Sequence, residues 1–355
     1  MNRGSCASQT AEARTPEQSA LPARCPACRK VSTKAPLESL HKSSLYACAE
    51  CDLHFWHPAA MPGASWYETA YQGRDQTAMP LEPGHRYFLS DPKAPKGGRL
   101  LDIGCGVGNF LAAASGAGFD VTGIEVNRNA ARFAQEHYGL KNISSQSPEE
   151  FLAARPLEKF DVVTFFEVLE HQENPQGFLE IAMDCLAPQG LIALSVPNRN
   201  RWQKAPDPLD YPPNHLTRWS PRALRNFLER NGFEIISLRE EPLHVLRAAQ
   251  VLSTGLRTGL ASRVAGERPP MLADLAEMNP AEMKETMVRL ESSGGHRLAA
   301  RLARWKNFLL MPAAISLLPY LRLRGYVGLY LYCLARMNDP AKNKVTAVRV
   351  GVSEK

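Results

Sequence analysis

Short apolar runs alternate with helical patterns through the middle of the chain. We expect buried strands at residues 99–103, 119–125, 142–145, 160–166, 191–196 and 233–238. Such runs are typical of a parallel sheet that is covered on both faces. Helix start signals separate them, such as the capping box that begins at Ser147, with proline at the first helical position. The alternation predicts an α/β fold over residues 99–239.

The pattern changes beyond residue 239. Residues 240–324 have a mostly helical pattern and precede a further apolar run at 325–336, within a final segment at 325–355. Between Ser292 and Asn338 the chain has seven basic residues and no acidic one, and its arginines and leucines lie on different helical faces. A basic amphipathic segment of this kind can lie at a membrane interface. The alternative is a helical cap over a substrate pocket, with the arginines in water.

Four cysteines in two C-x-x-C pairs mark the N-terminal part of the chain: Cys25, Cys28, Cys48 and Cys51. Two pairs at this interval can place four thiolates around one Zn²⁺. A closed site supports folding rather than catalysis, because so short a segment has little core of its own. We therefore expect a structural zinc ribbon at residues 22–58. An aromatic connector at 59–98 either packs the ribbon onto the next domain or partly covers the ligand pocket.

Length and composition are those of an ordinary globular protein. The 355 residues suggest about two domains, and residues 1–21 predict a disordered tail without a signal peptide. The net charge of +6 permits nucleic acid or an anionic membrane as a partner without requiring either. The cysteine pattern fits a reducing compartment, and no run is long enough for a transmembrane helix. We expect a cytoplasmic protein, with the inner face of the membrane as a further contact.

A glycine-rich turn after the first strand is the main candidate ligand site. Asp102, Gly104, Gly106 and Gly108 occupy alternate positions before a predicted helix. Glycine lets the backbone turn sharply and approach a ligand, and the helix start offers unpaired N–H groups. The spacing differs from the G-x-G-x-x-G of dinucleotide sites, and an acid at the strand end suits a cation. Glu125, at the end of the next strand, can accept hydrogen bonds from both ribose hydroxyls, which fits either of two adenosine ligands, S-adenosylmethionine (SAM) or NAD.

This turn resembles motif I of class I SAM methyltransferases, and the sequence Val168-Leu169-Glu170-His171 resembles a signature of the group that includes ubiquinone O-methylases. The resemblance implies a Rossmann-like sheet of seven strands, whose last, antiparallel strand would be 325–336. It also implies SAM as the cofactor, and an N-terminal zinc ribbon occurs in related enzymes. The expected cofactor-binding residues are Asp102, Gly104, Cys105, Gly106, Gly108, Glu125, Val126, Gln146, Phe166 and Glu167. Gln146 stands where many family members carry an acid for the adenine amino group.

Candidate catalytic residues follow the fourth and fifth predicted strands. His171 could accept a proton from a hydroxyl or phenol, since its unperturbed pKa is near neutral. Alternatively, it only shapes the pocket through bonds to neighbouring backbone. Tyr211 and His215 lie in a long aromatic loop at 199–219, where substrate-binding residues are often found. For these two residues packing is the alternative role.

We therefore expect a SAM-dependent methyltransferase that methylates oxygen or carbon of a small-molecule, glycan or lipid-like acceptor. SAM carries an activated methyl group, so the protein has to supply binding and orientation, and no catalytic triad is needed. Two alternatives remain: an rRNA or tRNA methyltransferase whose ribbon contacts RNA, and a non-catalytic SAM-fold binding protein. Arginines interleaved with leucines do not form a continuous surface for stacked bases. We therefore favour a small-molecule partner over nucleic acid.

Overall fold

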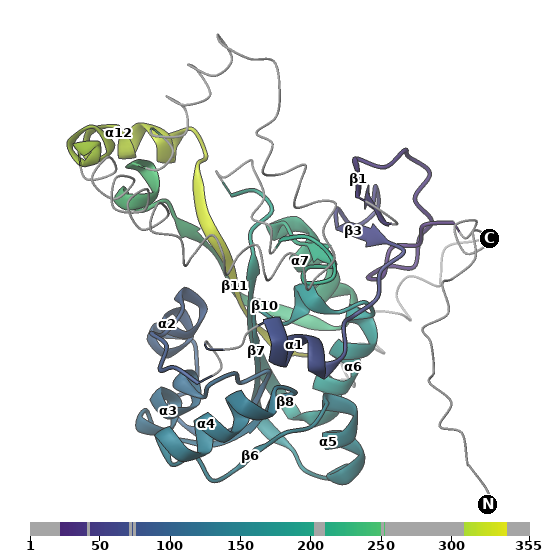
Figure 1. Ribbon diagram of the computed structural model, residues 1–355, viewed down its shortest axis with the longest axis vertical. Coiled ribbons are helices and arrows are strands. Elements are labelled where there is room, and N and C mark those ends of the chain that lie inside the picture. Colours follow the sequence, from purple (N-terminus) through teal and green to yellow (C-terminus); the bar gives the residue numbers. More distant parts are fainter. Residues whose placement is uncertain are drawn as a thin grey trace, which may run out of the picture.

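The structure is a computed structural model that describes residues 22–40, 43–70, 73, 76–201, 210–249, 252 and 309–338. Within these residues the chain forms one large sheet and one small sheet, with helices on the large one (Figure 1). The predicted tail at 1–21 lies outside the described residues, as do residues 292–308 of the predicted basic amphipathic segment.

The large sheet has the strand order β10-β11-β8-β7-β4-β5-β6 in the described part of the chain. Its strands are β4 (Gly98–Ile103), β5 (Phe119–Ile124), β6 (Ile143–Ser144), β7 (Phe160–Phe166), β8 (Leu186–Pro197), β10 (Phe233–Pro242) and β11 (Val327–Met337). The strands from β6 to β8 pair in parallel, whereas β11 is antiparallel to both β8 and β10. This arrangement confirms the expected Rossmann-like sheet and its antiparallel last strand.

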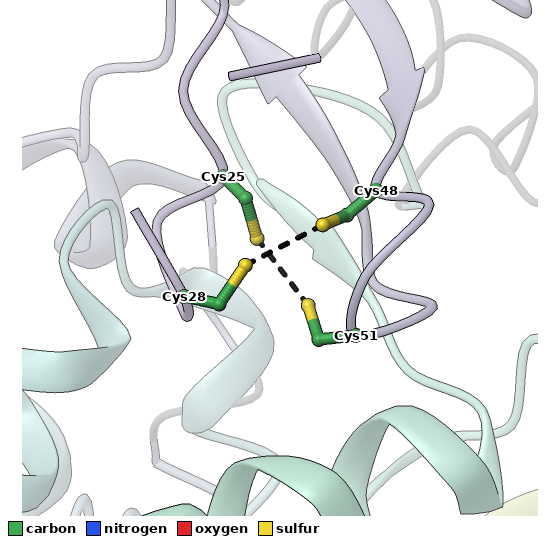
Figure 2. Close-up of side chains that lie close together, drawn as sticks. All are labelled: Cys25, Cys28, Cys48 and Cys51. Carbon is green, nitrogen blue, oxygen red and sulfur yellow. Dashed lines mark hydrogen bonds between the residues drawn. The ribbon is translucent and has the colours of Figure 1, made fainter. Parts of the chain in front are cut away.

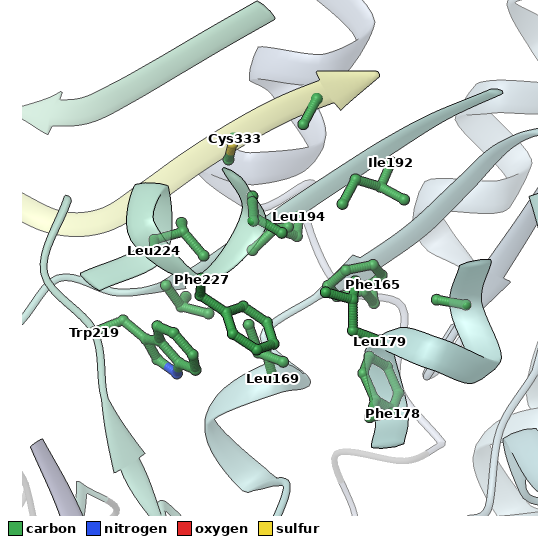
Figure 3. Packing of buried hydrophobic residues seen from close by; sticks show 14 of the residues in the cluster. Phe165, Leu169, Phe178, Leu179, Ile192, Leu194, Trp219, Leu224, Phe227 and Cys333 are labelled. Atoms are coloured by element: carbon green, nitrogen blue, oxygen red, sulfur yellow. The ribbon is translucent and has the colours of Figure 1, made fainter. Parts of the chain in front are cut away.

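Helices cover both faces of this sheet, because successive strand residues point to opposite sides. The described helices around it are α2 (Pro83–Ser90), α3 (Asn109–Gly116), α4 (Arg128–Tyr138), α5 (Pro148–Ala154), α6 (Pro175–Cys185) and α7 (Pro221–Arg230). Leu100 packs in a core with α2, α3 and α4, and the next residue, Leu101, packs in a second core with α5, α6 and α7. Figure 3 shows this second core, where Phe165 of β7 meets Phe178 of α6 at 5.2 Å between ring centroids. The covered sheet explains the apolar runs in the sequence.

One strand begins earlier than the sequence predicts. β8 starts at Leu186 rather than at residue 191, and it pairs with β7 first at Phe160 and then, after a shift of register, from Val162. Gln189 has a φ of +60° inside this irregularity. The predicted turn at 188–190 is therefore part of an irregular strand and not a break before it.

The small sheet joins the N-terminal segment to the main domain. Its order is β1-β2-β3-β9 in the described residues, with β1 (Glu38–Leu40), β2 (Ser43–Ala47), β3 (His54–His57) and β9 (Thr217–Arg218). The first three strands come from the N-terminal segment, but β9 comes from the loop between β8 and α7. Cys25, Leu53 and Phe55 belong to the same core as Trp219 and Phe227. The ribbon therefore packs directly on the main domain.

The described end of the predicted insertion forms α12 (Met311–Leu323). Ala314 and Leu321 are buried against Leu243, Ala248 and Ala249, which follow β10. In Figure 1, α12 lies on the left side of the view, and β1 and β3 lie on the right side. Among the residues that the structure describes, no helix combines the length and apolar character needed to cross a membrane.

Candidate functional site

The glycine-rich turn lies between β4 and α3, at the carboxyl edge of the sheet. Gly104, Gly106 and Gly108 have φ values of +77°, +52° and +81°, in the left-handed region that favours glycine. A Cβ at Gly104 would lie 2.7 Å from a methyl carbon of Val168, whereas a Cβ at Gly106 would meet no atom within 4 Å. The turn is thus closed against the protein at Gly104 and open to a ligand at Gly106.

Glu125 fixes the shape of this turn. It directly follows β5, and its two carboxylate oxygens accept hydrogen bonds from the backbone N–H groups of Gly106 at 2.9 Å and Asn127 at 2.8 Å. Each oxygen keeps a second lone pair. The carboxylate can therefore hold the turn and still accept a hydrogen bond from a ligand hydroxyl.

Buried acidity at the strand ends favours a cationic ligand. Asp102 is only 3% exposed, and one of its oxygens accepts a hydrogen bond from the Thr164 hydroxyl at 2.7 Å. Burial raises the pKa of Asp102 to about 7, and the nearby Glu125 adds to the rise. Burial also raises the pKa of Glu167. A positive charge among these groups would stabilise their ionised forms, so the site fits the sulfonium and ammonium of SAM.

A segment of the predicted connector covers one side of the turn. The His85 ring of α2 stacks on Phe110 at 5.0 Å and is nearly perpendicular to the Phe166 ring at 4.9 Å, centroid to centroid. The Asn109 side chain donates hydrogen bonds to the carbonyls of Met79 and Pro80. Burial lowers the pKa of His85 to about 4, so the ring is neutral. No pattern in the sequence predicted His85, although partial cover of the pocket was one of the two roles expected for the connector.

The other predicted cofactor residues lie around the same edge. Cys105 is 5% exposed and belongs to the core beside α3, so only its backbone can meet a ligand. Phe166 ends β7, and Glu167 follows it with a φ of +55°. The Glu167 carboxylate accepts a hydrogen bond from the Ser195 hydroxyl at 2.8 Å. Val126 and Gln146 are half-buried residues that follow β5 and β6.

A second group of polar side chains follows β7. Glu170 and His171 lie in the short 3₁₀ helix η2 (Leu169–His171), and His215 joins them from the loop before β9. The Glu170 carboxylate is 1% exposed and lies 3.9 Å from Nε2 of both histidines. Neither of its oxygens has a hydrogen-bond partner among the described residues. A buried polar group without partners costs stability. A native protein that keeps such a group has a reason for it, such as catalysis or a bound ion.

The tautomer of His171 follows from its neighbour. Nδ1 of His171 lies 2.7 Å from the carbonyl oxygen of Asn214. A carbonyl can only accept, so Nδ1 carries the proton and Nε2 keeps its lone pair. Burial, followed by the charge of His215, lowers the pKa of His171 to about 3. The ring is therefore neutral at physiological pH and offers Nε2 as an acceptor or a ligand.

Three side chains of this group could together hold a metal ion. One ligand atom from each of Glu170, His171 and His215 lies within 4.8 Å of the others, and imidazole and carboxylate are common ligands of divalent cations. The sequence predicted no metal at these residues. His215 is distant in sequence from the adjacent Glu170 and His171, and no spacing motif predicts their meeting.

The predicted residues of the long loop have different surroundings. Nδ1 of His215 lies 3.3 Å from a carboxylate oxygen of Asp210, which also pairs with Arg201. Burial raises the pKa of Asp210, but the bond with His215 and the charge of Arg201 outweigh burial and bring it to about 2. The Tyr211 hydroxyl donates to Glu38 of β1 at 2.9 Å. The structure thus brings His215 beside His171 and turns Tyr211 towards the ribbon.

The four predicted zinc ligands lie together, as Figure 2 shows. The sulfur atoms of Cys25 and Cys51 are 3.5 Å apart, as are those of Cys28 and Cys48, and all four lie within 4.8 Å of one another. A tetrahedron with Zn–S bonds of about 2.3 Å has edges of about 3.8 Å. The cluster therefore has the size and donor set of a structural zinc site.

Known proteins resemble the main domain. Residues 74–238 match the family model described as a methyltransferase domain. The ubiquinone biosynthesis O-methyltransferase of Psychrobacter arcticus is 38% identical over 109 residues, which are 29% of this chain and 42% of that protein. The protein of the same name from Glaesserella parasuis is 33% identical over 143 residues, 38% of this chain and 60% of its own. The chain thus spans about half the length of these curated relatives.

Among solved structures, the [4+2]-cyclase SpnF has a TM-score of 0.44 and 17% identity, and the match covers 79% of this chain and 99% of SpnF. That similarity is too low to support an argument about function. The family-model match at residues 74–238 includes the glycine turn, Glu125 and the strand β7 that leads to Glu170 and His171. Residues 74–238 are therefore a methyltransferase domain, similar to those of the class I SAM-dependent methyltransferases.

Proposed function

We propose that the protein transfers the methyl group of SAM to a hydroxyl of a small-molecule or lipid-like acceptor. The observation that carries the proposal is the pairing of two sites at one sheet edge. The glycine turn held by Glu125 lies at the end of β4, and the Glu170–His171–His215 cluster follows β7, the strand beside β4. Ligands of open α/β sheets bind at this edge. The relatives named O-methyltransferase favour oxygen as the accepting atom.

The cofactor residues have separate tasks in this proposal. The open backbone at Gly106 admits the ligand, Glu125 binds the ribose hydroxyls, and the buried charge of Asp102 favours the cationic methionine part. SAM supplies an activated methyl group, and its transfer needs an acceptor atom held close and in line. His85, packed between Phe110 and Phe166, would keep water from that side of the pocket.

The acceptor hydroxyl must lose its proton, and the cluster after β7 offers two ways to help. Nε2 of His171 can accept the proton, although the low pKa of this ring makes it a weak base. A divalent cation held by Glu170, His171 and His215 would instead lower the pKa of a bound hydroxyl. Neither carboxylate oxygen of Glu170 has a hydrogen-bond partner in the described residues, which favours the cation, because one of these oxygens lies beside Nε2 of both histidines as a ligand atom.

The four cysteines are proposed to hold one structural Zn²⁺. Three of them, Cys25, Cys48 and Cys51, are at most 6% exposed, and a Cys₄ site leaves no open position for chemistry. The metal would then stabilise the ribbon, as expected for a segment too small to fold without it.

We also propose contact with an anionic membrane through α12. Ile315, Tyr320 and Leu323 of α12 are 57%, 55% and 87% exposed, on a helix whose other face packs at Ala314 and Leu321. Residues 309–338 contain three arginines and no acid. Sedimentation with anionic vesicles tests this. Binding should weaken with salt, since basic residues contribute about 1 kcal/mol each at such a surface, and no binding at low salt would contradict the proposal.

The function is tested by incubating the full chain with methyl-labelled SAM and fractions of lipids, phenols, glycans and RNA. We expect label in a phenol or lipid fraction, with demethylated cofactor as the second product. Label only in RNA would contradict the proposed acceptor. Binding of NADH without binding of SAM or its demethylated product would contradict the proposed cofactor. In the described part of the chain, no feature favours RNA methylation or a non-catalytic role over transfer to a small molecule.

A further inference from the structure

The ribbon is hydrogen-bonded to the loop that carries His215. β3 pairs antiparallel with β9, with His54 opposite Arg218 and Phe55 opposite Thr217. The next residue of β3, Trp56, donates its N–H to the carbonyl of Leu216 at 3.0 Å. Main-chain bonds of the ribbon therefore hold residues 216–218 in an extended conformation.

The same loop residues bond to the cluster after β7. The N–H of Leu216 donates to the carbonyl of Glu170 at 2.8 Å, and the Asn214 carbonyl accepts from Nδ1 of His171. Leu216 is thus bonded on one side to the ribbon and on the other to η2. The relative positions of His215, His171 and Glu170 depend on this strip of backbone.

Asp52 adds a second connection. It directly follows the zinc-ligand candidate Cys51 and has a φ of +67°. Its carboxylate receives hydrogen bonds from the Arg199 guanidinium at 2.7 Å and from the Ser220 hydroxyl. Arg199 and Ser220 flank the loop at its two ends, and the N–H of Arg199 donates to the carbonyl of Trp219 at 2.8 Å. Asp52 therefore ties both ends of the loop to the cysteine cluster.

We propose that the cysteine cluster is a positioning element of the acceptor site. Through Asp52 and the β3–β9 pair, an intact ribbon holds the loop that sets His215 and His171 beside Glu170. This inference rests on the proposed function, because it assigns those residues to the acceptor side. The glycine turn is held separately, by Glu125 and by the bonds of Gly104 and Cys105 to the Ile124 carbonyl. Disruption of the folded ribbon should then lower turnover, whereas the affinity for the cofactor should stay the same.

Asp52→Ala in the full chain tests the inference, with Glu50→Ala as the matched control. Glu50 lies on the other side of Cys51, and its carboxylate forms a surface pair with Arg230, in which the Glu50 side chain is 56% exposed. Zinc content, affinity for the demethylated cofactor, amide hydrogen exchange and turnover are measured. For Asp52→Ala we expect retained zinc, cofactor affinity within about twofold, and exchange at Leu216 and Thr217 faster by about tenfold or more. Turnover should fall by about tenfold or more, as expected when catalytic groups lose their alignment.

Unchanged exchange at Leu216 and Thr217, both in Asp52→Ala and in wild-type protein stripped of zinc by a chelator, would overturn the inference. Equal effects of Asp52→Ala and Glu50→Ala would also overturn it. If Asp52→Ala does not fold, Asp52→Asn and the chelator treatment give the same comparison. Failure of the wild-type protein to bind demethylated cofactor would instead contradict the proposed function, and the exchange measurement would still decide the inference.

Discussion

Replacement of Glu170 by glutamine should make the protein more stable and less active. The Glu170 carboxylate is 1% exposed, and neither oxygen has a hydrogen-bond partner in the described residues. Burial raises its pKa well above the ordinary value, and the charge of Glu167 adds to the rise. A buried polar atom without a partner costs about 1–3 kcal/mol. Glutamine has nearly the same shape, carries no charge and can donate towards Nε2 of His171 or His215.

We expect Glu170→Gln to raise the free energy of unfolding by about 1–2 kcal/mol, part of the cost of the unsatisfied group. Urea unfolding without added divalent cations measures this. Turnover should fall by about 10²-fold or more, because the acceptor side loses its carboxylate. Asp210→Asn is the matched control: Asp210 is paired with Arg201 and His215, so its loss should lower the stability. If Glu170→Gln destabilises the protein as much as Asp210→Asn does, the carboxylate has a stabilising partner and the reasoning is wrong.

Four further predictions concern the remaining parts of the site. Gly106→Val should abolish SAM binding, and Glu125→Ala should weaken it by about 1.5–3 kcal/mol; calorimetry that finds unchanged affinity would refute both roles. His171→Gln should lower turnover by about 10²-fold or more at every pH, and near wild-type turnover would exclude His171 as base or ligand. Elemental analysis should find one zinc per chain, and Cys25→Ser should remove it while SAM still binds. Because burial lowers the pKa of His85 to about 4, its stabilising contribution should be full above about pH 6.5 and lost as the pH falls towards 4. Relative to His85→Asn, the wild type should lose up to about 3 kcal/mol over that range, and parallel pH profiles would refute this.

The sequence predicted the elements of the main domain because their signals are local. Strands in a sheet covered on both faces must be apolar, and helix ends must satisfy their own backbone groups. The capping box at Ser147 therefore marks a helix start in the sequence and in the structure alike. The glycine turn was equally predictable, since a sharp turn beside a ligand has few other solutions.

The irregular start of β8 was not predictable in the same way. Residues 188–190 have the composition of a turn, but pairing with β7 carries the strand through them with one shift of register. Tertiary pairing outweighed the local turn signal, as it often does for strands. The cover of the glycine turn by His85 likewise depends on where α2 packs, which no pattern within the connector specifies.

By itself, the sequence determined the seven strands of the large sheet, the glycine turn with Glu125 and the four cysteines, because each depends on residue type and spacing within a short segment. Only the tertiary structure decided that His215 lies beside His171 and Glu170, and that β9 completes the ribbon's sheet. Those contacts join segments far apart in the chain, and their geometry comes from packing of the whole domain. The same packing leaves the carboxylate of Glu170 buried without a hydrogen-bond partner in the described residues. Neither this burial nor the missing partner can be predicted from the sequence.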